Sequence, residues 1–175
     1  MNCKTVDVRN HFKSKDKNLY RYYFCLDCIG GYQWWRGNCY KFIRRTCTWE
    51  QAYQACRQSS YNKGALASIS SDSENHYVSQ LIQYSNSWIG GTFLRSNRWA
   101  WIDGNRWNGY RKPWAAGEPN NWKGNTRFED KIFMYGKSGR GPFGTWNDDG
   151  NRNDGFKVSG LSKDKVTGLV CKYKA

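Results

Sequence analysis

The chain has 175 residues and a formal net charge of +14, from 28 lysines and arginines against 14 aspartates and glutamates. Its 10 tryptophans, 12 tyrosines and 8 phenylalanines supply enough apolar ring surface for a folded core, which excludes a disordered tail. Three prolines exclude a proline-rich linker, and no apolar run approaches the roughly 18 residues of a membrane span.

The first part of the chain is polar and basic. Residues 1–24 have no hydrophobic period, and we interpret them as a basic N-terminal extension with one strand near 19–24. The main domain is expected over residues 25–175. Seven cysteines at scattered spacings favour disulfides and an oxidising, extracellular compartment over a zinc site. The lone Cys25–Cys28 pair, in a Cys-x-x-Cys pattern, is weak evidence for metal or redox chemistry.

Two helices are predicted next. Thr48 and Gln51 fit a capping box, and Ser71 and Glu74 fit a second one. Each box precedes an apolar stripe at helical spacing. The stripes are Trp49, Ala52, Tyr53 and Cys56 in the first helix, and Tyr77, Val78, Leu81 and Ile82 in the second.

After Tyr84 the pattern changes to short strands near residues 88–90, 99–102 and 168–171, with turns of glycine, asparagine and aspartate between them. Residues 103–160 form a long stretch without periodicity that is rich in glycine, asparagine, aspartate and tryptophan. Long loops of this kind are usually functional or disordered, and the tryptophans favour order.

This long loop carries the candidate metal ligands, which are carboxylate and amide oxygens: Glu118, Asn120, Glu129, Asn147 and Asp148. Such oxygens suit Ca²⁺, whereas zinc or copper would require histidine or cysteine, and His11 and His76 lie elsewhere. Asparagine, aspartate and glycine also form turns, and composition by itself leaves that alternative open.

A set of short motifs then extends the interpretation. The motifs, in chain order, are Cys28–Trp35, Cys39–Phe42, Thr48–Cys56, Leu66–Glu74, Trp88–Gly91, Trp99–Gly104, Gly117–Asn120, Trp146–Asp148 and Val170–Cys171. In this order they resemble the long form of the C-type lectin-like domain, over about residues 28–173, with its mannose-type Glu-Pro-Asn and Trp-Asn-Asp signature.

The resemblance implies an α+β fold with two helices, small antiparallel sheets and a long calcium-binding loop region. It also implies that the five oxygen donors above bind both Ca²⁺ and two neighbouring sugar hydroxyls, with Pro119 in the cis form. The longer gap between Asn120 and Glu129 makes Glu129 the least certain of the five. Trp122 is expected either to stack on a bound sugar or to pack the loop.

The same resemblance implies disulfides between Cys28 and Cys39 and between Cys56 and Cys171. Because Cys3, Cys25 and Cys47 then remain, an odd number, we expect a homodimer or oligomer, disulfide-linked through one of them.

The chain also departs from the family pattern. Lys131 stands where most members have a cysteine, so the disulfide that usually holds the long loop is absent. Phe93 and Asn97 lie where a second calcium site would need acidic ligands, so that site is expected to be lost.

The function implied is a secreted, calcium-dependent lectin for sugars with vicinal hydroxyls, with mannose, N-acetylglucosamine or fucose preferred and galactose a second candidate. The alternative is a basic protein that binds polyanions such as sulfated glycans or microbial surfaces without calcium. Nucleic acid is not expected as a partner of a disulfide-rich extracellular protein, and no transmembrane segment is expected. Glu118 and Glu129 resemble paired catalytic carboxylates only superficially, because the neighbouring amides favour a metal site, so no enzyme activity is predicted.

Overall fold

The computed structural model describes residues 28–108, 110, 113–121, 128–150 and 165–175 in full, and residues 3–8 and 20–25 as backbone. Within these ranges, no helix is both long and apolar enough to cross a membrane.

The described residues form two helices, α1 (Trp49–Ser59) and α2 (Asp72–Ile82), and ten strands. The strands are β1 (Cys3–Val8), β2 (Tyr20–Cys25), β3 (Gln33–Trp35), β4 (Asn38–Arg44), β5 (Ala65–Leu66), β6 (Ser87–Leu94), β7 (Arg98–Trp101), β8 (Lys131–Met134), β9 (Trp146–Asp149) and β10 (Gly168–Lys174). The α+β class predicted from the sequence is confirmed.

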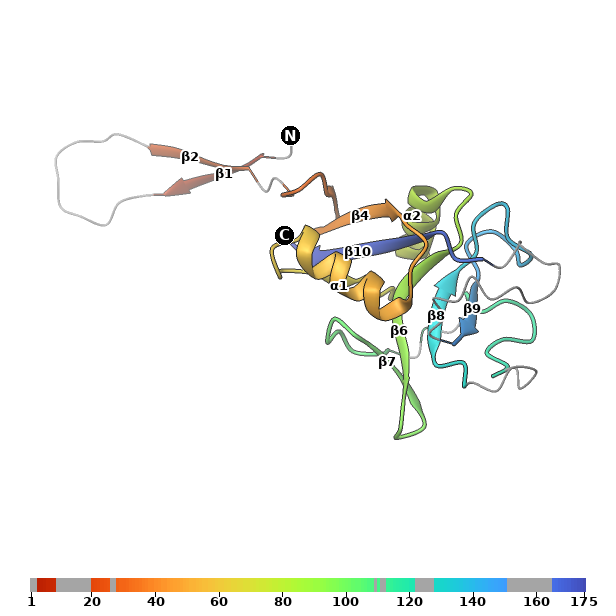
Figure 1. Cartoon of the computed structure of the whole chain (residues 1–175). Coiled ribbons are helices and arrows are strands. Elements are labelled where there is room, and N and C mark those ends of the chain that lie inside the picture. The colour runs from red at the N-terminus through yellow and green to blue at the C-terminus, as the bar shows by residue number, and fades with distance from the viewer. Residues whose placement is uncertain are drawn as a thin grey trace.

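The main sheet has the strand order β3-β4-β10-β6-β8-β9, with β5 paired to β10 and β7 paired to β6. The pair between β10 and β6 is parallel, and the other pairs are antiparallel. The C-terminal strand β10 therefore lies at the centre of the sheet, between β4 and β6, as Figure 1 shows. Strands β8 and β9 extend this sheet on the side away from β4, and they carry the candidate site.

Both helices begin where the sequence predicts. The Thr48 side chain accepts a hydrogen bond from the Gln51 amide, and the Gln51 side chain accepts one from the Thr48 amide, which completes the capping box. Ser71 caps α2 through the Glu74 amide. Each helix buries its predicted stripe only in part, since Tyr53 and Tyr77 are half-buried.

The core consists of two apolar clusters. One gathers α1 residues such as Trp49 and Cys56 against Leu169. The other gathers α2 residues such as Val78 against Trp146. Because Trp146 is fully buried and begins β9, the second cluster fixes the strand that carries two of the proposed calcium ligands.

Both disulfides implied by the resemblance are present. Cys28 and Cys39 join the start of the domain to β4, with an S–S distance of 2.02 Å. Cys56 and Cys171 join α1 to β10 across 115 residues. The Cys-x-x-Cys pattern is therefore not a metal or redox unit, because Cys28 is bonded to Cys39.

Two parts of the fold differ from the sequence prediction. The N-terminal extension contains two paired strands, β1 and β2, where one strand was predicted. The long loop over residues 103–160 contains the strand β8, which the absence of period-two alternation hid: all four of its residues are buried, so no polar face marks it.

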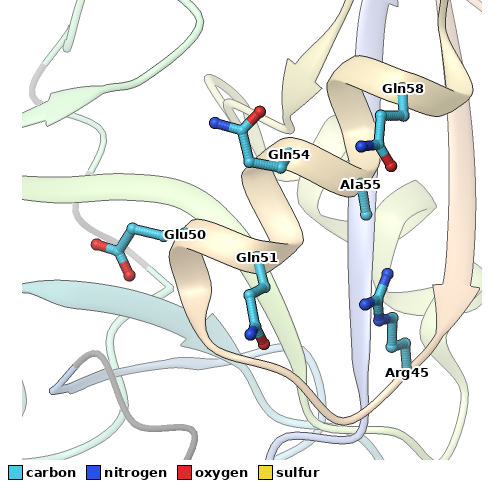
Figure 2. Close-up of a pocket in the computed structure, with 6 residues that line it drawn as sticks. All are labelled: Arg45, Glu50, Gln51, Gln54, Ala55 and Gln58. Carbon is cyan, nitrogen blue, oxygen red and sulfur yellow. The ribbon is translucent and has the colours of Figure 1, made fainter.

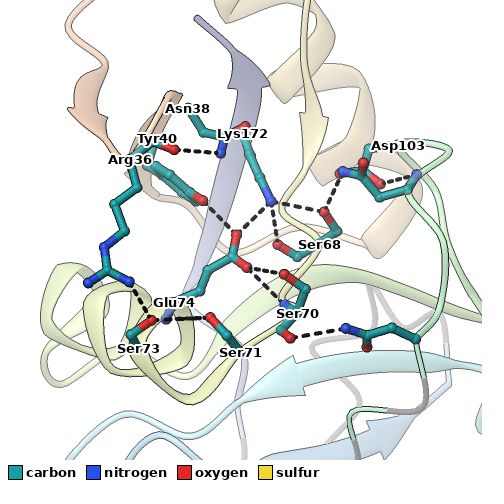
Figure 3. A network of polar contacts seen from close by, with 12 residues as sticks. Arg36, Asn38, Tyr40, Ser68, Ser70, Ser71, Ser73, Glu74, Asp103 and Lys172 are labelled. Atoms are coloured by element: carbon teal, nitrogen blue, oxygen red, sulfur yellow. Dashed lines mark hydrogen bonds and ion pairs between the residues drawn. The ribbon is translucent and has the colours of Figure 1, made fainter.

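A buried polar network joins α2 to β10 (Figure 3). The Lys172 ammonium donates to the Glu74 carboxylate over 2.6 Å, and Tyr40 donates to the same oxygen over 2.6 Å. Burial by itself would raise the pKa of Glu74, but the Lys172 ammonium outweighs burial and holds that pKa below its ordinary value.

The same network reaches the start of the long loop. Asn105 donates to the Ser68 hydroxyl, which also accepts from Lys172. Asn108 donates to the Ser70 carbonyl, and Ser70 donates to Glu74. The loop that leads to the candidate site is thus tied to the start of α2.

Candidate functional site

The site forms where the long loop runs beside β9. The amide of Trp146 donates to the Pro113 carbonyl over 2.6 Å, and the amide of Ala115 donates to the Trp146 carbonyl over 2.9 Å. Trp114 forms an isolated parallel bridge with Trp146. These bonds place the Gly117–Asn120 segment next to the strand that carries Asn147 and Asp148.

Asp148 orders the loop. Its carboxylate is 1% exposed and accepts the backbone amides of Asn120 and Asn121, over 3.0 and 2.9 Å. Two amide donors hold both carboxylate oxygens in place, so one lone pair on each oxygen remains available for another partner.

Two oxygens at the site accept no hydrogen bond within the part of the chain that the structure describes. Oε2 of Glu118 and Oδ1 of Asn147 are buried atoms without a hydrogen-bond donor among the described residues. The other Glu118 oxygen accepts from the Asn120 side-chain amide over 2.9 Å. A buried oxygen without a donor costs free energy, and an oxygen that binds a cation avoids that cost.

Glu129 reaches the same place from the far side of the loop. Its amide donates to Oδ1 of Asn121 over 3.0 Å, and the residue is 8% exposed. The Glu129 carboxylate lies near enough to Glu118 to add to the repulsion there. The structure therefore links the Glu129 backbone to Asp148 through Asn121, despite the longer gap in the sequence.

Electrostatics at the site favour a positive guest. Burial, followed by the neighbouring Asp148 carboxylate, raises the pKa of Glu118 to about 7. Negative oxygens that crowd together in a protein usually share a proton or a cation.

The donor set fits calcium. The described residues contain no group of three or more histidine, cysteine, aspartate or glutamate side chains placed to hold a metal. The carboxylates of Glu118, Glu129 and Asp148 thus do not form a metal cage by themselves, and Ca²⁺ would also need the amide oxygens, which it accepts in flexible geometry. Glu118, Asn120, Glu129, Asn147 and Asp148 together supply that mixture.

The local backbone matches expectation at one point and adds a residue at another. The Glu118–Pro119 peptide is cis, as predicted. Asn121 was not predicted as a site residue, although it links Asp148 to Glu129. The φ angle of Asn121 is 46°, in the left-handed region that asparagine tolerates better than most residues. The second asparagine after Pro119 was therefore the sequence feature that could have indicated this turn. Trp122 lies outside the described residues.

Lys131, which the resemblance places where most members have a cysteine, contacts three other parts of the fold. Its ammonium donates to Asp130 over 2.8 Å and to the Thr92 hydroxyl over 3.1 Å. It also lies 5.0 Å from the centre of the Trp49 ring and 4.0 Å from Glu50. This buried lysine therefore joins β8, which follows Glu129, to β6 and α1.

Two surface hollows lie apart from these ligands. One, of about 220 Å³, is lined on α1 by Glu50, Ala55 and three glutamines, with Arg45 reaching toward the helix (Figure 2). Another, of about 360 Å³, lies between α2 and the loop near Phe143. Neither contains the two oxygens without partners.

Comparison with known proteins identifies one family. The family sequence model for the Lectin C-type domain matches residues 45–173 of this chain. The C-type lectin lectoxin-Phi1 of Philodryas olfersii is 36% identical over 146 residues, which cover 76% of this chain and 88% of that protein.

Two further comparisons agree. C-type lectin domain family 4 member K of Mus musculus is 32% identical over 125 residues, which cover 69% of this chain. The match spans only 37% of that relative's length. The crystal structure of the cow carbohydrate-recognition domain of CD23, in the presence of a GlcNAc2Man3 oligosaccharide, superposes with a TM-score of 0.64 at 26% identity. That superposition covers 86% of this chain and 98% of the cow domain.

Proposed function

The chain belongs to the C-type lectin domain family, and from this premise we propose that it binds carbohydrate in a calcium-dependent manner. The observation that carries the proposal is the pair of buried oxygens without donors, on Glu118 and Asn147, beside the Asp148 carboxylate. Three separate segments of the chain converge there, and a cation, a proton or a donor from a bound ligand would satisfy such a group.

The proposed calcium ligands are Glu118, Asn120, Glu129, Asn147 and Asp148. Calcium bound there would supply open coordination positions for two neighbouring sugar hydroxyls. The chain's own groups then orient the sugar, because carboxylate oxygens accept hydrogen bonds from the hydroxyls and amide groups of asparagine donate to them. Because the acceptors and donors hold fixed positions, they select a pair of sugar hydroxyls with a matching geometry.

We propose mannose, N-acetylglucosamine or fucose as the preferred sugars, on the Glu118-Pro119-Asn120 signature, with galactose as a second candidate. Trp122 is proposed to stack on the apolar face of the sugar. Trp122→Ala should then weaken sugar binding by about 1–2 kcal/mol. It should leave calcium affinity nearly unchanged, whereas joint loss of both would mean that Trp122 holds the loop.

A basic polyanion-binding function without calcium is the second candidate. Arg45 beside the glutamines of α1 is the observation that favours it, since a guanidinium and amide groups together suit sulfate or carboxylate, although Glu50 adds a negative charge to the same lining. The net charge of +14 would assist such binding. Chelator should abolish the first function and high salt the second.

Several further properties are proposals as well. The two disulfides favour an extracellular, secreted location. We propose a homodimer or oligomer, because single lectin sites bind weakly and paired sites gain avidity. We infer a binding protein and not an enzyme.

The test is a glycan array with calcium, with chelator and with added salt, followed by two variants. Asn147→Ala should abolish sugar binding and leave the fold intact, because the residue is a half-buried ligand and not a core side chain. The matched control is Asn38→Ala, at the start of β4. Unchanged calcium affinity in Asp148→Ala, measured by calorimetry, would contradict the ligand assignment.

A further inference from the structure

An exposed aromatic ring lies next to the candidate site in the chain. Phe128 is 55% exposed, although phenylalanine is normally buried, and it directly precedes Glu129. The Glu129 amide donates a hydrogen bond to the Asn121 side chain, and the Asn121 amide donates one to Asp148. The backbone next to Phe128 is therefore linked to the Asp148 carboxylate, which also accepts from Asn120.

Phe128 is the outer end of a row of rings. Its ring centre lies 5.7 Å from that of Phe93, which lies 5.2 Å from that of Trp99. Trp99 in turn contacts Trp107 and Trp114. Phe93 and Trp99 face each other across the hairpin of β6 and β7, and both are half-buried.

The row is hydrogen-bonded to the segment that carries Glu129. The Phe93 amide donates to the Asp130 carbonyl over 2.8 Å, so the hairpin is bonded to the segment that carries Phe128 and Glu129. A ring supported from behind by two others loses little conformational freedom when a ligand covers it.

The apolar C–H face of a pyranose sugar can stack on an exposed aromatic ring of this kind. We propose that Phe128, backed by Phe93 and Trp99, forms a second sugar subsite. It takes the next residue of a glycan whose terminal residue lies at the Glu118–Asn120–Asn147 site. This inference rests on the proposed function, because continuity with that site is what selects a sugar as the occupant.

The test compares a monosaccharide, methyl α-mannoside, with mannotriose by calorimetry in calcium. Wild-type protein should bind mannotriose about tenfold more tightly than the monosaccharide. Phe128→Ala should remove this preference and leave monosaccharide affinity within about twofold, while Phe128→Trp should keep the preference. Tyr61→Ala is the matched control, since Tyr61 is 74% exposed in the turn after α1.

A second measurement reports the contact directly. Protein labelled with fluorophenylalanine should show a Phe128 fluorine resonance, assigned by its loss in Phe128→Ala, that shifts with mannotriose and not with methyl α-mannoside. An unchanged ratio of the two affinities in Phe128→Ala would overturn the subsite alone. Failure of both sugars to bind in calcium would overturn the proposed binding of mannose and the subsite with it, while binding of any other sugar in calcium on the glycan array would leave the proposed function standing.

Discussion

At the scale of single residues, the chemistry centres on the Glu118 carboxylate. One of its oxygens accepts from the Asn120 amide and the other is buried without a donor. Burial and the Asp148 carboxylate raise its pKa to about 7, so near neutral pH the calcium-free site holds a proton for part of the time. At the proposed calcium site, the metal and this proton would therefore compete for one place.

The first prediction concerns pH and the calcium-free protein. The folded-state pKa of about 7 for Glu118 lies above the ordinary glutamate pKa of 4.5, which applies in the unfolded chain. The folded chain therefore binds more protons than the unfolded chain between these values, and its stability should fall as pH rises through that window. Thermal unfolding in chelator at pH 4.5–7.5 measures this slope. Glu118→Gln should flatten it, and an equal slope in that variant would contradict the assignment.

The second prediction concerns how the stability of the folded protein changes with pH when calcium is present. Because the ligands must be ionised to bind the metal, calcium affinity should fall in acid. Stability in saturating calcium should therefore rise with pH where stability in chelator falls. Calorimetry in buffers of different ionisation enthalpy should show proton release on calcium binding near pH 7. Absence of proton release would indicate that Glu118 is already ionised in the free protein.

At the scale of elements, α2 and β10 are joined by a buried ion pair. The Lys172 and Glu74 side chains are 8% and 5% exposed. Removal of one partner leaves the other charge buried, which typically costs about 3–5 kcal/mol. Lys172→Met should therefore lower the free energy of unfolding by about that amount.

The double variant tests the coupling. In the double variant Lys172→Met with Glu74→Gln, neither charge of the pair remains. Its loss in free energy of unfolding should therefore be smaller than the sum of the losses in the two single variants. Denaturant unfolding of the four proteins measures the coupling. Strict additivity would show that the ion pair contributes nothing beyond its separate parts.

The replacement of the family cysteine also acts between elements. Lys131 contacts Asp130, Thr92 and the Trp49 ring, which ties β8 to β6 and α1. A disulfide constrains chiefly the unfolded chain, whereas these contacts stabilise the folded one. The loop between Asn120 and Glu129 is thus anchored at its C-terminal end without a covalent bond.

At the scale of the whole molecule, the cysteines bear on covalent assembly. Cys47 is buried at 4% exposure, and burial raises the pKa of its thiol, so it is a poor candidate for a bond to a second chain. Cys3 and Cys25 are partners in the register of β1 and β2. Residues opposite each other in antiparallel strands lie at a Cα separation that suits a disulfide.

The prediction is therefore a bond within one chain rather than the intermolecular bond expected from the odd cysteine count. A maleimide reagent should label no thiol in the native protein and one thiol, on Cys47, after unfolding without reductant. Denaturing gels with and without reductant should both show a single chain, since the proposed homodimer or oligomer is then held without a covalent bond. A dimer band that disappears in Cys25→Ser would show that the bond joins two chains.

Local sequence determined the parts of this protein whose cause is local. The capping boxes at Thr48 and Ser71 and the apolar stripes behind them specify the two helices, because caps and helical periodicity act within a few residues. The oxygen-rich residues Glu118, Asn120, Asn147 and Asp148 were likewise recognisable from the motif and its chemistry.

Tertiary structure decided what depends on contacts between distant segments. The strand β8 carries no polar alternation because both its faces are buried, so only its position between β6 and β9 defines it. The role of Asn121 also depends on distant segments, because its amide donates to Asp148 and its side chain accepts from the Glu129 amide. The two oxygens without donors became visible only in three dimensions, since burial and hydrogen-bond partners are properties of the packed chain.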